Sequence, residues 1–316
     1  MELQQLRYLC AIADTGSFSR AAEHCHVAQP SLSQQISKLE EELGARLFDR
    51  LGRSIRLTEA GRGFLPHARA VLHQTELARS EVDGRRRDAR GAVAVGVIPT
   101  IAPYYVPKRI AAFTRRFPAA TLRIVEETTP VLVESLRALA VDLAILSLPL
   151  KYRDFEILPL ITERLYAVLP PDHPRAGAAS LALRELRDEP FVLLRDSHCF
   201  RGIAITACER ARLDPRVAFE SGQFSSLLGM VAAGVGVTIV PEMAIDRSAA
   251  CRYVRISDPQ AFRTIAAARL KGRSLSRVQQ AFLQQLLAPS RNRLKAQAAS
   301  THRSQANLLS RNILSS

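Results

Sequence analysis

The order of short patterns in the first sixty residues constrains the fold of this chain more than any other feature. Apolar residues recur there with helical spacing, at Leu3, Leu6, Leu9 and Ala13. A second short helix is predicted from Ser17 to Cys25, and a third one opens at Pro30, because proline favours the first turn of a helix. Three short helices in this order fit a helix-turn-helix domain.

The third helix is predicted to bury one face and to expose a polar one. Its apolar stripe is Leu32, Ile36, Leu39 and Leu43, and Ser31 with Gln34 is predicted to form a capping box. The other face holds short or amide-bearing side chains, which can bond to base edges and phosphates. The residues of this helix predicted to contact DNA are Gln29, Pro30, Ser31, Ser33, Gln34 and Lys38.

After Gly44, arginines alternate with apolar residues as far as Leu57, a pattern that predicts a β-hairpin with Gly52 in its turn. Arg50 and Arg53 complete the predicted DNA contacts, and Arg53 suits a narrow minor groove, where the negative potential attracts a guanidinium. A lone helix-turn-helix pattern also fits a solvated helical domain. The capping box, polar face and basic wing together favour DNA binding instead.

The overall charge adds little to this prediction. The 316 residues carry a net charge of +14, but residues 1–90 hold 14 Lys and Arg against 12 Asp and Glu, a net of +2. The local arginine pattern is therefore the better indication of DNA. The stretch after residue 288 is basic and without acid, which predicts a disordered tail over 288–316.

The sequence shows neither a signal peptide nor an apolar run that could span a membrane. We therefore expect a cytoplasmic protein whose five cysteines are thiols. Their spacing fits no metal site, and we expect no metal, no cofactor and no catalytic residues.

A long helix is predicted from Thr58 to about Asp83, with a kink or local opening near Gly61 to Pro66. Small and apolar residues spaced by four and three predict a dimer seam: Phe64, Ala68, Val71, Thr75, Ala78 and Val82. The alternative is that this stripe packs on its own head. A short charged hinge follows at 84–91.

Beyond Gly91, short β-branched runs alternate with helical stretches, which predicts parallel sheets in doubly wound α/β units. The length of this region indicates two subdomains with a cleft between them. In such sheets, ligands bind at the carboxyl ends of the strands. The predicted division is a winged helix-turn-helix domain at 1–58, a linker helix and hinge at 59–90, an effector module at 91–287, and the tail.

The whole arrangement resembles a LysR-type transcriptional regulator over residues 1–287. The motifs that carry the resemblance are FSRAA at 18–22, QPSLS at 29–33, LFDR at 47–50 and LTEAG at 57–61. It implies a homodimer or homotetramer on double-stranded promoter DNA and a two-subdomain effector module like a periplasmic binding protein. It also makes RNA polymerase a candidate partner.

Within that family, the segment DSHCFR at 196–201, followed by Cys208, resembles the redox segment of the OxyR subgroup of peroxide-sensing activators, with Thr100 and Thr129 as further matches. Cys199 is predicted at a helix start beside His198 and Arg201, so the helix dipole and a cation should favour its thiolate. Peroxide would oxidise Cys199, and Cys208 would capture the product as a disulfide.

Nine residues of intact helix would hold the two cysteines about 13 Å apart, whereas a disulfide needs Cα atoms within about 7 Å, so this helix must open. Thr100 and Thr129 are expected to hold the peroxide or a water by hydroxyl hydrogen bonds.

Four alternatives stay open at this point. Thr100 and Thr129 also suit the carboxylate of a small metabolite, which would make the chain a ligand-responsive member of the family. Both cysteines are also compatible with small buried hydrophobes. A solute-binding protein fits less well, because a DNA-binding head is predicted. A thiol peroxidase also fits less well, because the sequence shows no partner that would reduce Cys199 for another turnover.

Overall fold

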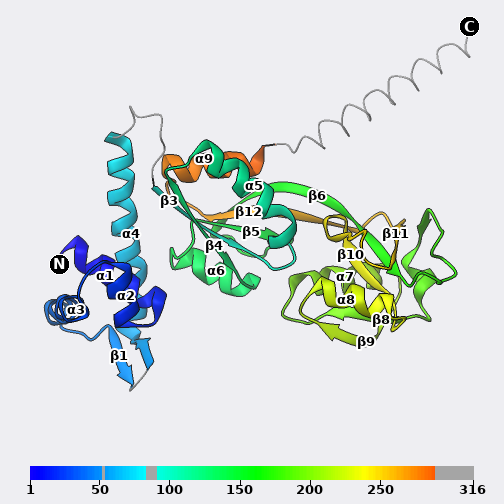
Figure 1. The fold of residues 1–316 in the computed structure, drawn as a ribbon, viewed down its shortest axis with the longest axis horizontal. Helices are drawn as coiled ribbons and strands as arrows, with labels where there is room; N and C mark the ends of the chain where they lie inside the picture. Colours follow the sequence, from blue (N-terminus) through cyan, green and yellow to red (C-terminus); the bar gives the residue numbers. More distant parts are fainter. Residues whose placement is uncertain (52–53, 83–90, 289–316) are drawn as a thin grey trace, which may run out of the picture.

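The computed structural model describes residues 1–51, 54–82 and 91–288, and it shows a helical head, a long helix and a two-lobed α/β module (Figure 1). The elements of the head are α1 (Leu3–Thr15), α2 (Phe18–His24), α3 (Gln29–Leu43), β1 (Phe48–Leu51) and β2 (Ser54–Leu57). The two strands pair antiparallel, with Leu51 opposite Ser54. Several predicted features lie outside the described residues: the turn residue Gly52, the DNA-contacting Arg53, most of the hinge, and the tail after Ala288.

The helix starts in the head follow local chemistry. Ser17 precedes α2, and its Oγ accepts a hydrogen bond from the Arg20 backbone N–H at 3.4 Å. The helix α3 begins at Gln29, with Ala28 as its N-cap and Pro30 in its first turn. The predicted capping box of Ser31 and Gln34 is wrong, because Ser31 already lies inside the helix and no side chain caps this helix start.

One apolar core joins the three helices of the head to the hairpin. Leu32, Ile36 and Leu39 of α3 are fully buried in it. Leu43, the fourth residue of the predicted stripe, is 38% exposed. The stripe is therefore one residue too long, because the helix ends there at Gly44 in the left-handed conformation (φ 65°).

The long helix α4 (Glu59–Val82) is helical throughout, so the predicted opening near Gly61 to Pro66 is wrong. Its first half packs on the head: Ala68 and Leu65 are buried in the head core, and Phe64 packs against it. Farther along, Val71 is 41% exposed, and Ala78 is exposed too. The predicted stripe thus divides into a half covered by its own head and a half that is open.

The first subdomain of the effector module is a sheet covered by three helices. Its strands are β3 (Gly91–Val97), β4 (Ala120–Glu126), β5 (Leu143–Ser147), β12 (Phe262–Leu270) and the first part of β6 (Phe155–Leu169), in the order β4-β3-β5-β12-β6. Its helices are α5 (Ala102–Arg116), α6 (Thr129–Arg137) and α9 (Arg277–Leu287). They enclose an apolar core of their own.

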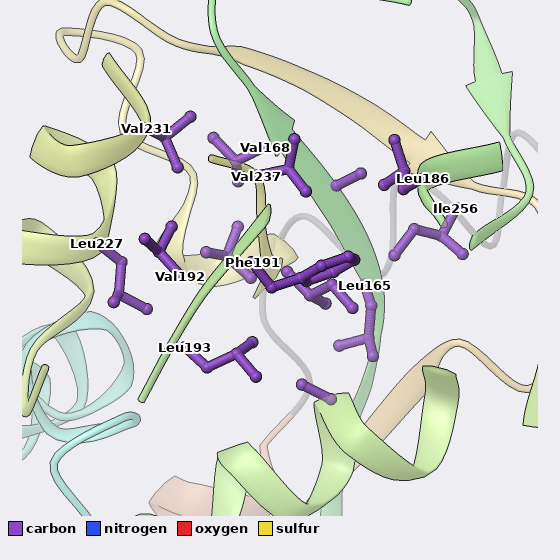
Figure 2. Close-up of a cluster of buried hydrophobic side chains, with 14 of the residues drawn as sticks. Leu165, Val168, Leu186, Phe191, Val192, Leu193, Leu227, Val231, Val237 and Ile256 are labelled. Atoms are coloured by element: carbon purple, nitrogen blue, oxygen red, sulfur yellow. The ribbon is translucent and has the colours of Figure 1, made fainter. Parts of the chain in front are cut away.

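The second subdomain has a separate apolar core around Phe191 (Figure 2). Its strands are β7 (Ser180–Leu181), β8 (Pro190–Leu194), β9 (Arg216–Ser221), β10 (Thr238–Pro241), β11 (Arg252–Ile256) and the last part of β6. Its helices are α7 (Cys199–Arg210) and α8 (Phe224–Ala232), with single 3₁₀ turns at Leu183–Leu186 and Glu242–Ala244. In Figure 1, β6 runs from one subdomain into the other.

The fold class predicted from the sequence is confirmed: a winged helix-turn-helix head precedes a two-subdomain α/β module. The all-parallel sheet is wrong. β3 pairs parallel with β4 and β5, but β12 is antiparallel to both β5 and β6. The reason is that the chain crosses between the subdomains along β6 and returns along β12, so these two strands run in opposite directions. No helix among the described residues could cross a membrane.

Candidate redox site and DNA interface

Cys199 is the first residue of α7 and lies where the two subdomains meet. His198 precedes it as the N-cap, in extended conformation. The half-buried Cys199 side chain packs against the core of the first subdomain, whereas the next residue, Phe200, is buried in the core of the second. The start of α7 thus places the Cys199 sulfur at the boundary between the two subdomains.

A buried arginine stands beside this sulfur. Arg263 of β12 is 1% exposed, and its Nε donates to Oε1 of the buried Glu163 at 2.6 Å. Its other nitrogens donate to the hydroxyl and the carbonyl of Thr100, at 3.3 and 3.1 Å. The guanidinium carbon lies 5.2 Å from the centre of the Phe200 ring, which is next to Cys199 in sequence. Arg263 therefore links strands that cross between the subdomains to the start of α7.

Burial raises the pKa of the Cys199 thiol above its ordinary value of 9.0. Four groups act in the opposite direction: the Thr129 hydroxyl, the Arg263 charge, and the backbone N–H groups of Cys199 and Phe200. The predicted stabilisation of the thiolate by a helix start and a cation is therefore present, but desolvation outweighs it. The Thr129 hydroxyl is itself buried and, within the described chain, forms no well-aligned hydrogen bond.

His198 and Arg201 do not supply the predicted cation. Burial and the nearby Arg195 lower the pKa of His198, so its imidazole is neutral near pH 7. Arg201 is held by Asp196 and Glu220, each at 2.6 Å, and also donates to the Leu194 carbonyl. Arg201 thus fastens the loop before α7 to its neighbours.

Cys208 lies near the far end of the same helix and is fully buried in the core of the second subdomain. Burial, followed by the charges of Asp258 and Glu209, raises the pKa of its thiol to about 12. Both cysteines are free thiols on one intact helix. The separation of about 13 Å predicted for nine helical residues therefore applies.

A cleft of about 600 Å³ separates the subdomains near this site. Its lining includes Thr100, Tyr104, Glu126 and Gln223. Of the described residues that line it, only Glu126 carries a charge. The cleft therefore suits a neutral or cationic ligand better than an anion. Across the described residues, no cluster of three or more His, Cys, Asp or Glu could hold a metal.

The residues predicted to read DNA lie mainly on the open face of α3. Exposed side chains there are Gln29, Pro30, Ser31, Gln34 and Lys38, and Ser33 is half-buried. The Gln29 side-chain carbonyl accepts a hydrogen bond from the Ser19 hydroxyl at 3.3 Å, which ties α3 to α2. Arg50 belongs to β1, but its side chain, like the whole of Arg53, lies outside the described structure.

Two residues that were not predicted from the sequence hold the β1–β2 hairpin in place, one on α3 and one on α4. Oε1 of Glu40 accepts hydrogen bonds from the backbone N–H groups of Leu47 and Phe48, at 2.7 and 3.2 Å. Gly61 of α4 passes so close to the hairpin that a Cβ atom there would come within 2.1 Å of the Leu47 carbonyl oxygen. The hairpin is therefore held against both α3 and α4.

Comparison with known proteins agrees with this architecture. A family model described as "Bacterial regulatory helix-turn-helix protein, lysR family" matches residues 3–62, and one described as "LysR substrate binding domain" matches residues 86–289.

Among curated proteins, the hydrogen peroxide-inducible genes activator of Pectobacterium carotovorum subsp. carotovorum is 34% identical over 270 residues, covering 84% of this chain and 89% of the relative. The transcriptional dual regulator GltC of Bacillus subtilis (strain 168) is 35% identical over 279 residues, covering 87% and 93%. Among solved structures, full-length OxyR C199D from Pseudomonas aeruginosa is 33% identical with a TM-score of 0.77, covering 91% of this chain and 93% of that one.

Proposed function

We propose that this chain, which belongs to the LysR family of bacterial transcriptional regulators, responds to hydrogen peroxide through Cys199 and Cys208. The observation that carries the proposal is the place of Cys199 at the subdomain boundary, beside the Thr129 hydroxyl and the buried Arg263. Its partner Cys208 lies on the same helix. The resemblance to a peroxide-inducible activator supports this function, and the equal resemblance to GltC makes a direct test necessary.

The proposed chemistry consumes one peroxide and two thiols. The Cys199 sulfur attacks one peroxide oxygen, the O–O bond breaks, and the departing hydroxide takes the thiol proton and leaves as water. Cys199 is then a sulfenic acid. The Cys208 sulfur attacks the Cys199 sulfur, an S–S bond forms, and the sulfenic hydroxyl leaves as a second water with the Cys208 proton. The two thiols lose two electrons, and the peroxide gains them.

Arg263 and the two threonines are proposed to act on the oxygen that leaves. Negative charge develops on that oxygen as the O–O bond breaks, and preorganised donors at such a position lower the barrier. The guanidinium already donates to Thr100, and Glu163 neutralises and orients it. This arrangement favours the transition state, although burial keeps most Cys199 protonated in the resting protein.

Opening of α7 is proposed to reach the head through the linker helix. Arg69 of α4 donates to the Ala138 carbonyl at the end of α6, at 3.0 Å, and the His73 imidazole contacts the Ser274 carbonyl at 2.7 Å. Both contacts join α4 to the first subdomain. A change in how the second subdomain sits on the first would therefore alter the support of α4 and of the DNA-binding head.

The open half of α4 is proposed as the dimer seam of a homodimer or homotetramer. Val71 and Ala78 are exposed, and the partly buried Thr75 lies between them. Phe64 and Ala68 are removed from the predicted seam, because they pack in the head core of the same chain. Two heads on one dimer would present two recognition helices to two half-sites in promoter DNA.

In each head, the exposed polar face of α3 is proposed to read bases through Gln29, Ser33 and Gln34. Lys38, Arg50 and Arg53 are proposed to contact the backbone or the minor groove. A cytoplasmic location and contact with RNA polymerase stay predictions.

A second candidate function rests on the cleft of about 600 Å³, whose volume falls in the range of small-molecule sites. In this alternative the regulator responds to a bound metabolite and the cysteines stay reduced. The predicted anionic metabolite fits poorly, because Glu126 is the charged residue that lines the cleft. A neutral or cationic metabolite is the form of this alternative that the cleft supports.

The deciding experiment is mass mapping of the cysteines under non-reducing conditions after a brief, low dose of peroxide. A peptide pair joined through Cys199 and Cys208 is expected in the wild type, together with a changed DNA footprint. Cys199→Ser should lose both, and Cys208→Ser should form a sulfenic acid without the lasting footprint change. Cys199 that stays reduced while the footprint responds to a metabolite would establish the alternative.

A further inference from the structure

We propose that the junction of head, linker helix and effector module is a second binding site, which takes a small organic anion. The cavity at this junction has a volume of about 640 Å³, well within the range of small-molecule sites. All three parts of the chain line it: α1 with the end of α2, Leu72 of α4, and Arg123 of β4. A ligand there would contact the head and the effector module at once.

Positive charge exceeds negative charge around this cavity. Arg7 and Arg123 line it, and the charge of Arg69 acts on the thiol of Cys10 in its wall. The carboxylate of Asp14 is shared between two guanidiniums: it bonds Arg69 at 2.6 Å and lies 3.5 Å from Arg123. Within the described chain, Arg7 forms no ion pair. Three guanidiniums beside one carboxylate fit an anionic ligand.

The rest of the wall has an apolar part and a polar part. The apolar part is Cys10, Ala11, Cys25 and Leu72, and the polar residues are Gln4, Thr15 and His24. Burial raises the pKa of the Cys10 thiol to about 11 and also raises that of Cys25, so both thiols are uncharged near neutral pH. Uncharged thiols behave as small hydrophobic groups. Carboxylates on a short carbon chain match this surface, with the carboxylates toward the arginines and the carbons toward the thiols and Leu72.

This site is separate from the redox site and from the cleft between the subdomains, with which it shares no lining residue. Its ligand would connect Arg7 of the head with Arg123 of the effector module. Binding would therefore hold the head in one orientation on the module, whatever the oxidation state of Cys199. The same chain could then respond to two unrelated signals.

The test uses the full-length reduced protein and succinate, a short dicarboxylate, at constant ionic strength. Because Cys10 and Cys25 line the cavity, bound succinate should slow their alkylation by N-ethylmaleimide, measured by mass spectrometry. At a succinate concentration of about four times Kd, the rate should fall about fivefold by mass action. Cys199 lies outside the cavity and should react at an unchanged rate. Succinamide, which has the same carbon chain and no charge, should give no protection.

Arg7→Gln and Arg123→Gln should each raise the succinate concentration needed for protection by about tenfold, because each removes one charge-assisted contact. Arg115→Gln on the exposed side of α5 is the matched control and should leave protection unchanged. The proposal is overturned if succinate at about 20 mM, above the millimolar range of weak sites, protects neither thiol. Equal protection by succinamide, or full protection in both arginine variants, overturns it as well.

Discussion

Replacing Thr129 by valine isolates one contact of the reactive thiol. Valine keeps the shape of threonine and has a methyl group in place of the hydroxyl. In the wild type, that hydroxyl lowers the pKa of Cys199. Since that hydroxyl forms no well-aligned hydrogen bond in the described structure, its loss leaves no other buried group unsatisfied. The variant should therefore fold as the wild type does and oxidise more slowly.

The expected change in rate is modest because two effects oppose each other. We assign this contact about 1 to 1.5 kcal/mol, the upper part of the range for ordinary hydrogen bonds in proteins, so its loss lowers the thiolate fraction about 5- to 13-fold below the thiol pKa. A more basic thiolate is also more nucleophilic, with a Brønsted coefficient of about 0.4 to 0.5, which returns about half of that loss on a logarithmic scale. The net prediction is oxidation of Cys199 slowed about two- to fourfold.

The assay follows formation of the Cys199 sulfenic acid by dimedone trapping in the Cys208→Ser background, where no disulfide can form. Thr128→Val is the matched control, because Thr128 is the neighbouring N-cap of α6 and its side chain makes no cap hydrogen bond. An unchanged rate in Thr129→Val, or the same loss in Thr128→Val, would refute the assigned contact.

Three further predictions concern the switch, the head and the seam. Because the pKa of the Cys199 thiol is raised above 9.0, its oxidation rate should rise nearly tenfold per pH unit from about pH 6 to about pH 8, and a plateau below about pH 7 would contradict this. Gln34→Ala should weaken specific operator binding by about 1 to 3 kcal/mol, whereas Lys38→Ala should reduce the salt slope of binding; unchanged footprint titrations in both would exclude these contacts. Val71→Asp should shift light-scattering mass toward the monomer, because it places a charge in an apolar seam, and a dimer mass retained in this variant would place the seam elsewhere. Glu76→Lys is the control, because Glu76 is exposed on the side of the helix away from the seam, and it should leave the mass unchanged.

The spacing of residues in the sequence was sufficient to predict features that lie within a single helix. The helix α3 with its buried Leu32, Ile36 and Leu39 follows from a 3.6-residue period, and the placement of Cys199 and Cys208 on one helix follows from a single helical stretch. The predicted start of α3, at Pro30, is one residue later than the observed start at Gln29. There, proline in the first turn was compatible with a helix that begins earlier.

The site itself depends on contacts that spacing does not reveal. Arg263 and Glu163 are 100 residues apart and meet only because β6 and β12 pair side by side between the subdomains. A lone arginine at the start of an apolar strand was the available signal for Arg263. His198 and Arg201 show that closeness in sequence does not guarantee an electrostatic role. Both are near Cys199 in the chain, but the carboxylates of Asp196 and Glu220 hold the Arg201 guanidinium, and burial lowers the pKa of His198.

The burial of Cys208 sets the order of events in the proposed switch. A fully buried thiol whose pKa is about 12 cannot attack while α7 is intact, so oxidation of Cys199 must come first and opening of the helix second. At high peroxide, opening then limits disulfide formation. Rapid-quench mass spectrometry should show a sulfenic acid that forms in proportion to peroxide concentration, and a disulfide that follows after a lag at a rate independent of it. A disulfide that appears without a lag, at a rate still proportional to peroxide at the highest doses, would mean that Cys208 reaches Cys199 without helix opening.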